Sequence, residues 1–211
     1  MAVSDQTSKA YCSFMASITS AKLIDYSNAT DPTMADPQFK EQLDHWDITT
    51  VILYRSGLSL AAVSLLPPAI LPAYVSLAHW LMLLAVALCC FAVHIYDKNI
   101  RLIIQGCGWL SLLLMLAAQN WPMPWFELLS IGAAYLVFGA LCFKESFCFR
   151  IPFLRAMPAV FALTWVILAT GWTSAHRLLL VVIVLAMAIM AVAKWRMPLH
   201  FDIGDKRNYQ L

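Results

Sequence analysis

The sequence predicts an all-α membrane protein, a bundle of six transmembrane helices with both termini on the cytoplasmic side. Three observations point to this fold class. Hydrophobic residues make up 62% of the 211 positions and charged residues only 12%, whereas soluble domains contain about half and about a quarter. The apolar residues gather in segments close to the roughly 20 residues that a bilayer-spanning helix needs. Lys and Arg fall between alternate segments, which sets an orientation.

The first element in order is a polar N-terminal tail, residues 1–46. It lacks the basic start and short apolar core of a cleaved signal peptide. Tyr11, Phe14 and Ile18 recur at three- and four-residue steps, which predicts an amphipathic helix lying on the membrane or on the bundle. We expect this tail to stay in the cytoplasm.

The membrane domain is predicted at residues 47–196, followed by a cytoplasmic C-terminal tail at 197–211. Pro67 and Pro68 are expected to stop the first span, because proline rings cannot continue a helix. The polar segments 97–99 and 144–152 are expected to be turns on the cytoplasmic side. The six predicted spans are 48–66, 74–96, 100–118, 125–143, 153–172 and 175–193.

Basic residues set the predicted orientation. All 14 Lys and Arg residues except Arg55 and Arg177 lie in the two tails, in the second and fourth connections, or beside them. The positive-inside rule therefore puts both termini in the cytoplasm. Aromatic residues agree with two interfacial belts, an outer one of Trp121, Trp125 and Trp172 and an inner one of Trp46, Tyr96 and Trp195.

Arg55 is the most informative single residue, because it lies about eight residues, or roughly 10 Å, inside the first span. An unpaired charge there costs at least about 3 kcal/mol. One interpretation is an anion or substrate site. The other is structural: Arg55 pairs with Glu145 or Asp97, or reaches lipid phosphates. Glu145 is the preferred partner, and its neighbour Lys144 is expected to point outward to the interface.

Cysteine and histidine offer a weak metal-binding hypothesis. His94, Cys142 and Cys148 could supply soft ligands, but the two cysteines are six residues apart, wider than the usual two to four. We predict no metal or cofactor and treat the six cysteines as small hydrophobic residues.

Glu127 and Arg177 are the acid and the base of the predicted outer face, at the starts of the fourth and sixth spans. They are expected either to pair or to remain separately solvated, since an interfacial ion pair contributes little to stability.

Three short motifs resemble a known family. LYRSGL in the first span and the turns HIYDKNIR and CFKESFCF are similar to the integral membrane proteins grouped as domain of unknown function 2301. The resemblance covers about residues 44–198. It implies a stand-alone domain in a bacterial inner membrane, and it implies no particular activity.

Three hypotheses for the function follow. No phosphate-binding loop, dinucleotide fingerprint or hydrolase motif is present. This favours the first hypothesis, a non-enzymatic accessory or assembly component that binds a membrane-protein partner or its own copies. The sequence gives no indication of nucleic-acid binding. A second hypothesis is a small-solute transporter or channel, in which Arg55, Glu145 and His94 line a cytoplasmic vestibule. A third is a metal-binding or redox protein that uses Cys142, Cys148 and His94.

Overall fold

The computed structural model describes residues 43–70, 72–121, 123–149 and 151–203. The amphipathic helix predicted near the N-terminus lies outside these residues, as does the end of the C-terminal tail. All the regular structure in the described part is helical, so the predicted all-α class is confirmed.

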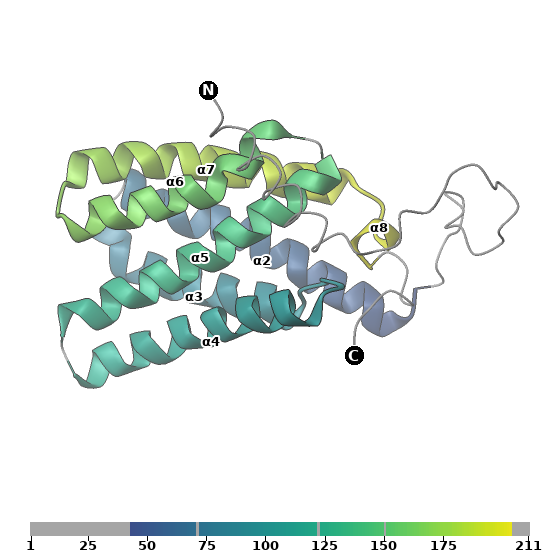
Figure 1. The fold of residues 1–211 in the computed structure, drawn as a ribbon, viewed down its shortest axis with the longest axis horizontal. Helices are drawn as coiled ribbons and strands as arrows, with labels where there is room; N and C mark the ends of the chain where they lie inside the picture. Colours follow the sequence, from purple (N-terminus) through teal and green to yellow (C-terminus); the bar gives the residue numbers. More distant parts are fainter. Residues whose placement is uncertain (1–42, 71, 122, 150, 204–211) are drawn as a thin grey trace, which may run out of the picture. The chain divides into compact units, whose positions relative to one another are not determined.

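Six long helices form the bundle, with a 3-10 turn, η1 (Pro72–Tyr74), before the second and a short helix, α8 (His200–Ile203), after the last (Figure 1). The six are α2 (His45–Ile70), α3 (Val75–Phe91), α4 (Lys98–Asn120), α5 (Pro124–Phe149), α6 (Pro152–Ala169) and α7 (Thr173–Arg196).

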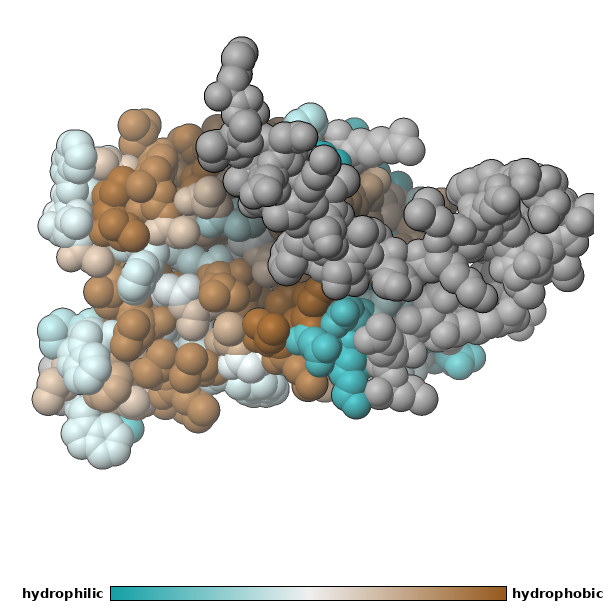
Figure 2. Space-filling view, in the orientation of Figure 1, coloured by the Kyte–Doolittle hydropathy of each residue, from teal (hydrophilic) through white to brown (hydrophobic). Residues whose placement is uncertain are grey.

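The helices are suited to a bilayer. Five are long and apolar enough to cross one, and α3 is a shorter apolar helix of 17 residues. Large apolar side chains face outward, with Leu113 at 63% and Leu178 at 69% exposure. Figure 2 shows hydrophobic residues over the middle of the visible face. Exposed apolar surface on this scale indicates contact with lipid.

Two predicted span ends are wrong. The first helix continues through Pro67 and Pro68 to Ile70. Each of these prolines removes one backbone hydrogen bond, and the loss is tolerated so close to the end of the helix. The second helix ends at Phe91 instead of residue 96. Asp97 then caps α4, because its Oδ1 accepts hydrogen bonds from the backbone N–H groups of Asn99 and Ile100.

The predicted polar turn at 144–152 is also wrong over most of its length. Residues 144–149 form the last turns of α5, and Glu145 within them is completely buried. Burial of a charged group such as Glu145 is tolerated only where partners neutralise it, and the site below supplies those partners.

The helices pack in a closed ring in chain order, since each packs on its neighbours in sequence and α7 packs on α2. α5 lies between α4 and α6 and also contacts α3 and α7 (Figure 1). Close packing of α2 on α3 depends on Gly57, where an added Cβ would lie 2.8 Å from Sγ of Cys89. The interior between α2, α5 and α7 is filled by buried side chains that include Leu58, Phe138 and Met187.

Candidate functional site

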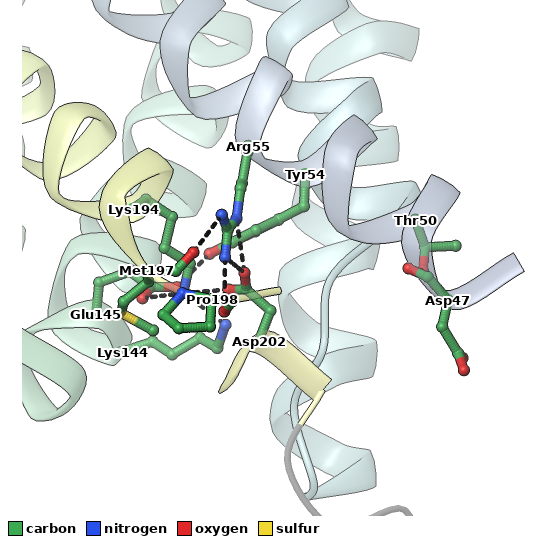
Figure 3. A network of polar contacts seen from close by, with 10 residues as sticks. All are labelled: Asp47, Thr50, Tyr54, Arg55, Lys144, Glu145, Lys194, Met197, Pro198 and Asp202. Carbon is green, nitrogen blue, oxygen red and sulfur yellow. Dashed lines mark hydrogen bonds and ion pairs between the residues drawn. The ribbon is translucent and has the colours of Figure 1, made fainter. Parts of the chain in front are cut away.

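Two acids and two bases form a buried network at the end of the bundle where α8 lies (Figure 3). Arg55 on α2, Glu145 on α5, Lys194 on α7 and Asp202 on α8 are each at most 7% exposed. Side chains from α2, α5 and the α7–α8 region, which are distant in sequence, therefore meet at one point. Their formal charges sum to zero, which is the condition under which burial of ions is tolerated.

Arg55 holds the segment that follows α7. Its Nε donates to Oδ2 of Asp202 at 2.7 Å, and Nη2 forms an ion pair with the same oxygen. Nη1 donates to the carbonyl oxygen of Met197 at 2.8 Å, and Nη2 to that of Pro198 at 3.2 Å. The predicted pairing of Arg55 with Glu145 or Asp97 is wrong, because α8 returns beneath α2 and supplies Asp202 instead.

Glu145 is the other centre of the network. Its Oε1 accepts hydrogen bonds from the hydroxyl of Tyr54 at 2.7 Å and from Nζ of Lys144 at 3.0 Å, and its Oε2 from Nζ of Lys194 at 2.6 Å. Lys144 therefore does not point away to the interface as expected. Lys194 also forms an ion pair with Asp202, so its ammonium bridges the two carboxylates.

The arrangement is suited to fastening the bundle and not to binding a solute. The donors of Arg55 and the oxygens of Glu145 are already engaged within the protein, and both residues are almost completely buried. Removing one partner of such a pair is costly because the other charge stays buried, typically by about 3–5 kcal/mol. The network thus closes this end of the bundle.

His94 lies beside the network, in the connection between α3 and α4. Its Nε2 is 3.3 Å from Oγ1 of Thr50. Its Nδ1 is buried with no hydrogen-bond partner in the described part of the chain. Burial and the nearby ammonium of Lys144 lower the pKa of His94 to about 4, so this imidazole is neutral at physiological pH.

A pocket of about 440 Å³ opens at the opposite end of the bundle. We call it the polar pocket. Within it, Nδ1 of His79 lies 2.9 Å from Oε1 of Glu127. Of the two expectations for Glu127 and Arg177, a mutual pair or separate groups, the pair is therefore not formed, and Glu127 pairs with His79 instead. The lining residues are Ser64, Leu65, Pro68, Val75, Ala78, His79, Met82, Pro124, Glu127, Leu128, Ile131, Tyr135, Leu168, Ala169, Thr173, His176 and Arg177.

The polar pocket and the network lie along the same helices. Ten residues of α2 separate Leu65 in the pocket from Arg55, which corresponds to about 15 Å. The same number on α5 separates Tyr135 from Glu145. Buried apolar side chains fill the interval, so the pocket ends inside the protein and does not reach the other end.

None of the cysteines that the structure describes lines the polar pocket or forms a hydrogen bond with the network. Sγ of Cys142 lies 3.4 Å from Sδ of Met187, and Cys148 is exposed. Within residues 43–203, as far as they are described, no group of three or more His, Cys, Asp and Glu side chains is placed to hold a metal ion. The hypothetical ligand set of His94, Cys142 and Cys148 is therefore not assembled.

Sequence reasoning missed Lys194, Asp202 and His176 as site residues. Lys194 carried a usable signal, because it follows Met187 and Met190 on one helical face, at steps of seven and four. That periodicity continues the apolar face of the last span instead of starting a polar tail. Asp202 had no such signal, since the return of α8 depends on tertiary contacts.

The chain matches the model of a family described as "Uncharacterized integral membrane protein (DUF2301)" over residues 86–211. This match starts at residue 86, later than the expected residue 44, and so leaves out the LYRSGL motif; it continues past residue 198, where the resemblance was expected to end, and so includes Asp202. A protein of Haemophilus influenzae described as "Uncharacterized protein" is 39% identical over 178 residues, which are 84% of this chain and all of the relative. No solved structure matches the chain. The chain thus belongs to the DUF2301 family of integral membrane proteins.

Proposed function

We propose that this protein is a small-solute transporter whose binding site is the polar pocket. One observation carries the proposal: the bundle has a pocket lined by histidine and charged side chains at one end and is closed by the buried network at the other. In the hypothesis drawn from the sequence, the solute met Arg55 and Glu145 in a cytoplasmic vestibule. The proposal now places it at the other end, beside His79 and Glu127.

The argument follows the helices that the two sites share. α2, α5 and α7 each contribute lining residues to the pocket and charged residues to the network. Alternating access requires a site that is open on one side while the other side is closed. Separation of these helices at the network end would open the path, and the ion pairs of Arg55 and Lys194 would oppose it until a bound solute offsets their loss.

Flux measurements test this proposal. Purified protein in liposomes should take up at least one solute from a panel of carboxylates, amino acids and sugars. Arg177→Gln, at the pocket, should lower that flux, whereas Arg155→Gln, on an exposed arginine of α6 near the network end, should leave it unchanged. No uptake from the panel, or equal losses in both variants, would contradict transport through the pocket.

A second candidate, an accessory or assembly component of a membrane complex, is favoured by a different feature. A groove of about 740 Å³ runs along α5 between α4 and α6, and its lining is almost wholly apolar. Leu114, Leu136 and Ala162 contribute to it from these three helices. Small and apolar side chains on such a face suit the close approach of a further transmembrane helix, which would belong to the partner.

Photocrosslinking in membranes tests this candidate. A photoreactive residue at Leu136, in the groove, should give one discrete adduct with another polypeptide. The same residue at Leu178, on the exposed face of α7, should not. Adducts with lipid alone at both positions would count against an accessory role.

A further inference from the structure

The chemistry of the polar pocket indicates what kind of solute it takes. Nitrogen bases outnumber acids on its wall: His79, His176 and Arg177 face the single carboxylate of Glu127. That carboxylate contacts His79, and no ion pair joins it to Arg177 in the described structure. The guanidinium of Arg177 therefore has no matching acid among the described residues.

A further polar group on the wall lacks a partner. Nε2 of His176 is buried and has no hydrogen-bond partner among the described residues. Buried polar atoms of this kind are normally satisfied, so an exception in a cavity points to a missing ligand atom. Tyr135, whose side chain ends in a hydroxyl group, is also a lining residue.

The backbone adds to the same preference. The first residues of α3 and α7, Val75 and Thr173, line the pocket. Neither helix start is capped by a side-chain hydrogen bond from its N-cap residue, Tyr74 or Trp172. Helix N-termini carry about half a positive charge and favour anions.

The rest of the lining is apolar, including Leu65, Met82, Ile131 and Leu168. A pocket of this volume lies within the range of small-molecule sites, about 300–1,000 Å³. The walls therefore suit a ligand whose charged group is small and whose body is hydrophobic.

We infer that the polar pocket binds a small organic anion, a carboxylate on an apolar body, with Arg177 and His176 holding the anionic oxygens. This inference rests on the proposed function only for the location of the site, because binding does not require transport. An anionic lipid headgroup offers the same chemistry, and the experiment separates the two sources.

The test uses the full chain in a non-ionic detergent and follows its thermal unfolding by tryptophan fluorescence. Sodium benzoate is the probe, and benzamide is a neutral control of nearly the same shape. Benzoate should raise the unfolding midpoint by a few degrees at concentrations well above its Kd, and benzamide should not. Micelles doped with phosphatidylglycerol or with phosphatidylcholine form the lipid arm.

Arg177→Gln and His176→Gln should each abolish the shift caused by benzoate, and Arg155→Gln should retain it. If Arg177→Gln does not fold, Tyr135→Phe keeps the shape of the wall and should weaken the benzoate shift by several-fold. Equal shifts with benzoate and benzamide, or a shift that survives in Arg177→Gln, would overturn the inference.

If the unfolding midpoint shifts with phosphatidylglycerol but not with benzoate, and the shift depends on Arg177, the inference of a free solute would be overturned, and the ligand would be a lipid headgroup. The outcome also separates this inference from the transport proposal. Benzoate binding without flux leaves the inference standing and removes transport. Flux of another solute without benzoate binding leaves the transport proposal standing and removes the inference of an organic-anion site.

Discussion

At the scale of single residues, the chain places ions where solvent cannot reach them and satisfies each with a partner from another helix. Lys194 is the clearest case, since its ammonium contacts both Glu145 and Asp202. Such groups are energetically coupled, so the effect of losing one depends on whether its partner is present.

Lys194→Met tests this coupling. It leaves two buried carboxylates with fewer cations, and we expect a loss of about 3–5 kcal/mol in the free energy of unfolding. Adding Glu145→Gln should cost clearly less than the sum of the two single changes, by about 0.5–3 kcal/mol. Denaturant unfolding in detergent measures both quantities. Arg196→Met, an exposed position on the same helix, is the control, and additive losses would refute the coupling.

His94 gives a pH dependence. Its pKa is about 4 in the folded protein and about 6.5 when unfolded, so between these values the unfolded chain binds more protons. Stability due to neutral His94 is thus complete above about pH 6.5 and falls as the pH drops toward 4. We expect wild type to lose about 1 kcal/mol more than His94→Gln over this interval, after allowing for partial exposure. Parallel pH profiles of stability for wild type and His94→Gln would contradict this contribution of His94.

At the scale of elements, the helix pair α2 and α3 depends on the absence of a side chain. Gly57→Ala should destabilise the protein by about 1–3 kcal/mol, because the new methyl group meets both Sγ and the backbone nitrogen of Cys89. Gly106→Ala is the matched control, since nothing lies within 4 Å of its added Cβ; it should be neutral or stabilising by up to about 1 kcal/mol. Thermal unfolding of the two variants gives the comparison, and equal effects would be inconsistent with close packing.

The sequence was sufficient to predict the six long helices but not α8, the ends of the helices or the partners of the charged residues. Apolar segment length identifies all six helices, because the bilayer imposes it. The ends of the helices depend on local energetics that composition does not reveal. Pro67 is tolerated within α2, and α5 continues through Lys144 and Glu145, whose buried charge is neutralised by a lysine from α7. The partner of Arg55 required the return of α8, and no periodicity in a single sequence encodes that.

At the scale of the whole molecule, orientation in the membrane remains a prediction from the basic residues. Alkaline phosphatase fused after Asn120 should be active, because that connection is predicted to face the outside. A fusion after Asp97 should be inactive, since it would remain in the cytoplasm. Enzyme activity normalised to protein level decides the matter. The reversed pattern would place the polar pocket on the cytoplasmic side.

The contacts of Arg55 have a consequence for how the chain is made. This arginine is in α2, the first of the described helices to be synthesised, yet its carboxylate partner and its two carbonyl partners belong to residues 197–202, which follow α7. During membrane insertion its charge is not matched until the five later long helices have been made. A prematurely terminated product would keep a bare guanidinium at membrane depth, a defect by which surveillance proteases could tell unfinished chains from complete ones.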